Sequence, residues 1–150
     1  MREILFRGKL KDTGEWVYWD VFGRITTHTG KQYILTVTSG AHTAYYYHAY
    51  QIMEKIDRTS IGQSTSLKDK NRKRIFEGDI IHLDYIGKTH GVEGIATVIF
   101  ENGKFGVKWG WHKEFVCLDG FANTTLEIVG NINDNTQLSE RDVGNAPDVR

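Results

Sequence analysis

The chain has 150 residues, 39% hydrophobic and 25% charged, which is ordinary for one soluble globular domain or two small units that share a core. Its 19 Lys and Arg residues equal its 19 Asp and Glu residues, which argues against a surface that is basic throughout. Cys117 is the single cysteine and cannot form an internal disulfide, and no apolar run approaches the roughly 20 residues of a membrane span. We therefore expect a protein of the reducing cytoplasm, with no membrane partner and no cofactor.

Residues 1–60 are predicted to form an N-terminal antiparallel β subdomain. Residues 3–10 and 16–22 read as the two arms of a hairpin, because Asp and Gly in the connection favour a turn. A further turn around Gly30 precedes residues 32–38, which we interpret as a third strand.

The segment 43–53 is ambiguous between strand and helix. It holds four tyrosines in six positions, and aromatic side chains lose χ1 freedom in a helix, so a strand is the favoured interpretation. The helical alternative, with Tyr46, Tyr50 and Met53 aligned on one face, stays open.

Residues 61–138 are predicted to form a small SH3-like β-barrel with little helix. Its five strands would be separated by regularly spaced turns, and closure would remove the free edges of a short sheet. Asn102 and Gly103 lie between two apolar runs and give the strongest hairpin signal in the chain. The predicted strands are 79–86, 92–100, 105–109, 114–118 and 126–132. The polar residues 139–150 are predicted to be a disordered tail.

Three segments carry a resemblance to a known family. The central one reads IGQ at 61–63, LKDKN at 67–71 and IFEGDII at 75–81, and it is flanked by REILFR at 2–7 and EIVGNI at 127–132. In order and separation these segments resemble the YopX family of phage and prophage proteins. The resemblance covers about residues 2–138 and implies a mainly β protein with an SH3-like C-terminal part, but no chemistry.

The chain departs from the family pattern at three positions. Ser64 stands where the family usually has an aromatic residue, and Ser66 and Arg72 stand where it has glycines. Without a glycine after Asn71, the turn either differs from that of the family or places Asn71 in the left-handed region.

The run of residues 68–74 is the most basic stretch of the chain. It holds five positive charges and one negative charge, from Asp69. Basic side chains on a turn beside a small barrel are able to contact nucleic-acid phosphates. The structural alternative is a solvated turn whose lysines keep it soluble. The candidate phosphate contacts are Lys68, Lys70, Arg72, Lys73 and Arg74.

Aromatic residues are the other candidate contact group. Tyr45, Tyr47, Trp109 and Trp111 are interface candidates, since aromatic side chains on an outward face suit a subunit or partner interface. Core packing is the structural alternative for each of them. The two tryptophans are expected to lie on the same side of a strand.

Catalytic chemistry has little support in the sequence. There is no glycine-rich phosphate loop, serine elbow or paired-carboxylate motif, and Glu77 and Asp79 bracket a turn whose amides they are expected to cap. The six histidines lack metal-ligand spacing, and His42 and His48 have no evident third ligand.

These observations predict a non-enzymatic β module that forms a homo-oligomer and binds a phage or host protein in the bacterial cytoplasm. The alternative is a nucleic-acid-binding module that uses the basic turn.

Overall fold

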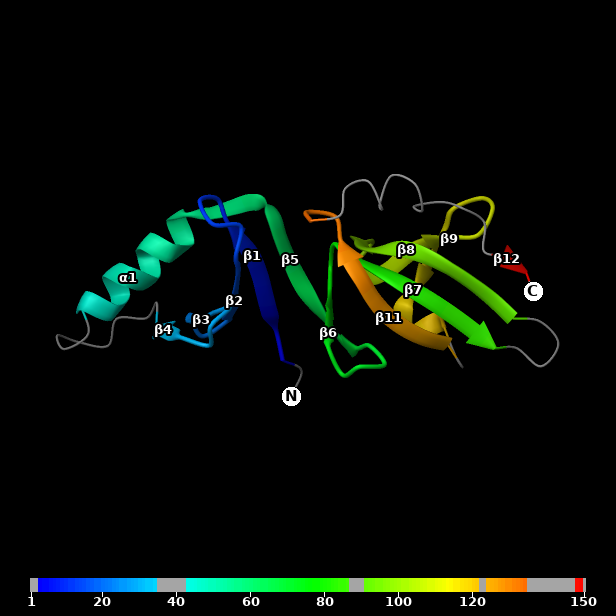
Figure 1. The fold of residues 1–150 in the computed structure, drawn as a ribbon, viewed down its shortest axis with the longest axis horizontal. Coiled ribbons are helices and arrows are strands. Elements are labelled where there is room, and N and C mark those ends of the chain that lie inside the picture. The colour runs from blue at the N-terminus through cyan, green and yellow to red at the C-terminus, as the bar shows by residue number, and fades with distance from the viewer. Residues whose placement is uncertain (1–2, 35–42, 87–90, 122–123, 135–147, 150) are drawn as a thin grey trace. The chain divides into compact units, whose positions relative to one another are not determined.

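The protein is mainly β, with two antiparallel sheets and little helix (Figure 1). A computed structural model describes residues 3–34, 43–86, 91–121, 124–134 and 148–149. The chain divides into two compact units, Met1–Ser66 and Leu67–Arg150. The sequence placed this boundary six residues earlier, between residues 60 and 61.

The first unit contains a meander of antiparallel strands. The predicted hairpin is formed by β1 (Leu5–Leu10) and β2 (Trp16–Asp20), and β3 (Arg24–Thr27) and β4 (Gln32–Ile34) follow it. The strand β5 (Ile56–Lys68) pairs with β1, which gives the sheet order β4-β3-β2-β1-β5-β6. The last two residues of β5 belong to the second unit. Sequence reasoning did not predict β3 or most of β5, whose residues are largely polar.

The segment 43–53 forms a helix, α1 (Thr43–Glu54), so the strand prediction was wrong. Ala49 is fully buried, and Ile52 and Met53 pack with it against a core that contains Val17 and Ile25. One apolar stripe at helical spacing therefore meets the sheet, and burial outweighs the weak helix propensity of tyrosine. The helical alternative placed Tyr46, Tyr50 and Met53 on one face. Met53 packs against the core, whereas Tyr50 is exposed.

The second unit contains an open five-stranded antiparallel sheet. Its strands are ordered β10-β9-β8-β7-β11 and are β7 (Asp79–Ile86), β8 (Gly91–Glu101), β9 (Lys104–Trp109), β10 (Glu114–Cys117) and β11 (Thr124–Asn131). No pairing joins β10 to β11 among the described residues, so the closed SH3-like barrel is not formed. Besides these strands the unit has β6 (Arg74–Phe76) and a short 3-10 helix, Leu118–Gly120.

The core of the second unit lies on one face of this sheet. Its buried residues are Ile75, Ile81, Leu83, Ala96, Val98, Val107 and Leu118. Trp109 packs against this cluster and covers Gly94, where a Cβ atom would lie 2.7 Å from the indole Cη2. Gly94 is thus explained by close packing in a regular register with Leu83.

Two predicted turns are confirmed. Asn102 and Gly103 both have positive φ, 51° and 77°, as the two-residue hairpin between β8 and β9 requires. Gly78 has φ of 87° at the corner before β7. Its N–H donates a hydrogen bond to the Val98 carbonyl, and its carbonyl accepts one from the Ile132 N–H. Asp79 accepts a hydrogen bond from the Phe76 amide at 2.8 Å, in line with its expected capping role.

Of the polar tail 139–150, the structure describes only β12 (Asp148–Val149). These two residues pair antiparallel with Val92 and Glu93 of β8. The rest of the tail lies outside the described residues, and its disorder stays a prediction.

Candidate nucleic-acid interface

The basic turn, residues 68–74, connects β5 to β6 and is organised around the Asp69 side chain. Its Oδ1 atom accepts hydrogen bonds from the amides of Asn71 and Lys73, both at 2.9 Å. The Asp69 amide also donates to the Lys73 carbonyl, and the Arg72 amide donates to the Asp69 carbonyl. An Asp at the start of a turn suits this arrangement because its short side chain reaches amides two and four residues later.

Asp69 also joins the turn to the outer side of β11, an edge strand of its sheet. Its Oδ2 atom accepts a hydrogen bond from the Ile128 amide at 3.2 Å. The Lys70 amide donates a hydrogen bond to the Leu126 carbonyl at 2.8 Å. The turn therefore occupies backbone groups that an edge strand would otherwise expose to other chains. Asp69 is only 6% exposed as a result.

Asp69 remains ionised in this buried position. Burial by itself would raise the pKa of Asp69, but hydrogen bonds from the amides of Lys73, Ile128 and Asn71 hold that pKa below its usual value. The positive charge of Lys73 acts in the same direction. The negative charge of the turn is thus the buried Asp69 carboxylate, which backbone N–H groups bind.

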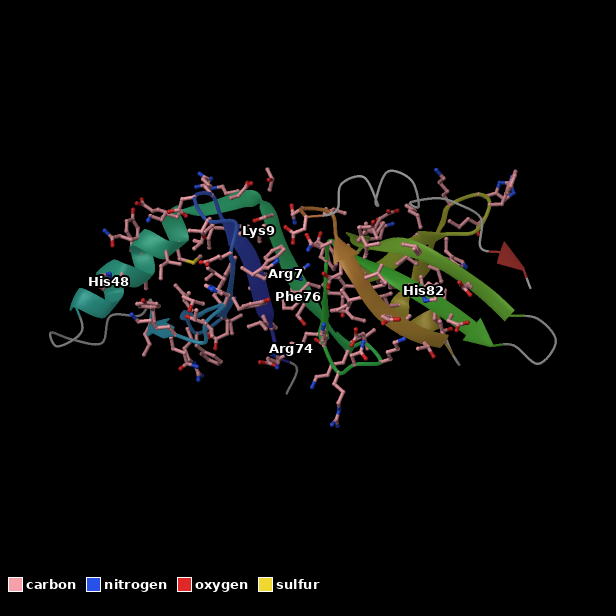
Figure 2. All side chains as sticks on the ribbon, in the orientation of Figure 1. Arg7, Lys9, His48, Arg74, Phe76 and His82 are labelled. Atoms are coloured by element: carbon pink, nitrogen blue, oxygen red, sulfur yellow. The ribbon has the colours of Figure 1, made fainter. Side chains whose placement is uncertain are left out.

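The five basic residues of the turn are all exposed: Lys68, Lys70, Arg72, Lys73 and Arg74. Arg74, the last residue of the turn, is also the first residue of β6 (Figure 2). The Lys70 ammonium lies 2.6 Å from Oε2 of Glu127, a residue of β11 that sequence reasoning did not single out. The structure thus places all five predicted phosphate contacts on one short exposed segment.

Two residues beside or within the turn adopt left-handed backbone. Ser66 has φ of 69° and Arg72 has φ of 66°. These are two of the positions where the resemblance implies glycine, so the chain keeps a glycine-like conformation with ordinary side chains. The residue in the left-handed region is therefore Arg72, and the alternative that placed Asn71 there was wrong.

The two tryptophans among the aromatic interface candidates lie in different environments. Trp109 packs in the core, edge-on to Phe121 with ring centroids 5.8 Å apart. Trp111 lies two residues later, after Gly110 with φ of 78°, and is 81% exposed. The two indoles do not share a strand face, because β9 ends at Trp109. Tyr45 and Tyr47 lie in α1, and their side chains are outside the described part of the structure.

No other cluster with evident chemistry occurs among the described residues. They contain no group of three His, Cys, Asp or Glu side chains that would hold a metal ion, and His42 lies outside them. His82, on β7, has its Nε2 atom 3.3 Å from Oε1 of Glu93 on β8 (Figure 2). In the described parts of the chain, no helix has the length and apolar character needed to cross a membrane.

Comparison with known proteins identifies one family and one fold. A family model described as YopX protein matches residues 5–140. The crystal structure of protein EF1440 from Enterococcus faecalis is similar, with 23% sequence identity and a TM-score of 0.50. The similarity covers 91% of this chain and 97% of that one, and it indicates a shared fold. No curated protein matches the chain.

We predict that Asp69→Asn destabilises the protein by about 2 kcal/mol at pH 7, because one carboxylate acceptor becomes an NH2 group facing backbone donors. Urea unfolding measures this loss. The folded-state pKa of Asp69 is lowered, so its contribution is complete above a pH of about 4 and declines as the pH falls through the folded-state pKa. The difference between wild type and variant should therefore shrink on acidification.

The control for Asp69→Asn is Asp57→Asn. Asp57 also accepts a backbone amide, that of Thr59 at 3.0 Å, but it lies at the surface of the first unit. We expect a smaller loss from this substitution. Equal losses from both variants would show that Asp69 has no special role.

We predict that Arg72→Gly stabilises the protein by about 1 kcal/mol, because glycine adopts φ near 66° without steric cost. Thermal or urea unfolding measures the change. Lys73→Gly, at an exposed neighbour without positive φ, should instead destabilise by about 0.5 kcal/mol through the entropy of the unfolded chain. A loss of stability in Arg72→Gly would contradict this prediction.

Proposed function

The chain belongs to the YopX family, and we propose that it binds nucleic acid through its basic turn. The family is not a known enzyme family, so the proposal concerns binding. The observation that carries it is the burial of Asp69, which leaves the exposed surface of residues 68–74 with basic side chains and Asn71. We place this binding in the cytoplasm of a bacterial cell that carries the phage or prophage.

Local charge supports the proposal although the whole chain is neutral. Charges act over a Debye length of roughly 10 Å at 0.1 M salt, so a compact group of cations attracts phosphates largely independently of distant acids. Phosphate contacts release counterions, and binding through them weakens steeply as salt rises. With few contacts available, we expect modest affinity and strong salt sensitivity.

The composition of the turn favours duplex nucleic acid bound without sequence preference. Residues 68–74 contain no aromatic side chain, so the turn offers no platform on which unpaired bases would stack. Lysine and arginine side chains contact phosphates, which position a protein on a duplex but carry no sequence information. A duplex also presents its phosphates at regular spacing to several cations at once.

We predict that replacing Lys68, Arg72 and Lys73 together with glutamine weakens binding to a duplex DNA oligonucleotide by at least about tenfold at about 50 mM salt. The slope of log affinity against log salt should fall in magnitude by two to three, because each lost phosphate contact contributes about 0.9. Fluorescence polarisation across a salt series measures both quantities.

The matched control replaces Lys11, Lys31 and Lys104, which are exposed elsewhere, with glutamine and changes the net charge equally. The control should retain most of the affinity and the salt slope. An equal loss in both triple variants, or no binding by wild type at low salt, would contradict the proposal.

A second candidate function is assembly with itself or with a phage or host protein. One observation favours it: the Trp111 indole is 81% exposed on the turn between β9 and β10. Exposed aromatic side chains often anchor protein interfaces, because they bury a large area with few rotamers to order.

If Trp111 anchors a homo-oligomer, light scattering at micromolar concentration should show an oligomer for wild type and a monomer for Trp111→Ser. Phe22→Ser, which removes an aromatic side chain that is 57% exposed in the first unit, serves as the control and should leave the mass unchanged. A monomeric wild type would remove the oligomer from consideration.

A further inference from the structure

Glu127 faces the basic turn and already occupies one of its cations. The Lys70 ammonium and the Glu127 carboxylate are 2.6 Å apart, and their side chains are 45% and 34% exposed. The backbone of Lys70 is fixed by the hydrogen bond that its N–H donates to the carbonyl of Leu126, one residue before Glu127. The ion pair therefore joins two elements that the backbone already holds together, so only the two side chains have to be ordered for it to form.

Glu127 also continues a row of charged groups across the sheet. It lies opposite His82 of β7 in the strand register, and His82 contacts Glu93 of β8. The hydrogen bond from Lys70 lowers the pKa of Glu127, and the charge of Lys70 and a hydrogen bond from the Asn71 side chain act in the same direction. Glu127 is thus ionised at neutral pH and competes with any other anion for Lys70.

We propose that Glu127 is a specificity-determining residue of the nucleic-acid site, where its carboxylate holds Lys70 until a phosphate displaces it. This inference rests on the proposed function. Lys68, Arg72 and Lys73 make the first phosphate contacts, and Lys70 joins the interface only when Glu127 releases it. Glu127 therefore lowers the affinity for every anion and sets a minimum charge density for binding.

The competition favours a duplex over an acidic protein surface. An acidic partner protein would replace the Glu127 carboxylate at Lys70 with another carboxylate, so the exchange adds little binding free energy. A duplex brings a row of phosphates that reach Lys70 and the neighbouring cations together, and the combined release of counterions offsets the lost ion pair.

The test compares Glu127→Gln with Glu93→Gln in the full chain. Both variants lose one negative charge, but Glu93 contacts His82 on the neighbouring strand. With a duplex DNA oligonucleotide at about 50 mM salt, Glu127→Gln should bind about two- to fivefold more tightly than wild type. The salt slope should become steeper by about one, since Lys70 then contributes fully. Glu93→Gln should change the affinity less and leave the slope unchanged.

A double-mutant cycle separates direct competition from a general change in charge. Lys70→Gln should cost little affinity in the wild-type background, where the phosphate contact that Lys70 gains is offset by the loss of its ion pair with Glu127. It should cost several-fold more in the Glu127→Gln background. Thermal unfolding of each variant confirms that the comparison is made between folded proteins.

The outcomes distinguish this inference from the proposed function. If wild type binds the duplex and Glu127→Gln behaves like Glu93→Gln, the inference is overturned and the proposed function stands. If the effect of Lys70→Gln is the same in both backgrounds, the inference is likewise overturned. If neither wild type nor Glu127→Gln binds at low salt, the proposed function fails and the inference fails with it.

Discussion

The buried carboxylate of Asp69 is the interaction on which the basic turn depends. Taking a carboxylate out of water is costly, and three backbone amides offset that cost through charge-assisted hydrogen bonds. Two of these amides belong to the turn and the third to β11, so one side chain both shapes the turn and attaches it to a sheet edge. The same contacts occupy the outer side of β11, where exposed backbone groups would invite pairing with another chain.

The surface of the turn follows from this attachment. Asp69 is buried whereas the neighbouring lysines and arginines are exposed, so the solvent-facing side of the turn is basic. Arg72 keeps its charge in a left-handed conformation that favours glycine over arginine, so the backbone at this position is strained where the turn carries a cation. Glu127 is the opposing element, since it holds Lys70 from the neighbouring strand. The proposed affinity for nucleic acid therefore depends on two opposing features: the exposed cations of the turn and the Glu127 carboxylate that binds one of them.

Local turn chemistry was predictable from the sequence, and tertiary placement was not. The Asn102–Gly103 hairpin and the Gly78 corner were predicted because positive φ has a direct signature in residue type. The helix α1 was missed because burial of Ala49 and Met53 against a sheet outweighs the propensity of its tyrosines. The closed barrel was wrong because strand count does not determine whether the ends of a sheet meet. Glu127 was missed because β11 reaches the turn through contacts that span about 59 residues of chain.

We propose that the turn anchored by Asp69 is the surface that contacts nucleic acid. Amide chemical shifts of the 15N-labelled protein, followed during titration with a duplex DNA oligonucleotide at low salt, test it most directly. We predict that the largest changes fall on residues 68–74 and on Glu127, while the amides of Asn71, Lys73 and Ile128, which donate to Asp69, stay protected from exchange. Changes centred elsewhere, or no changes at saturating duplex, would contradict it.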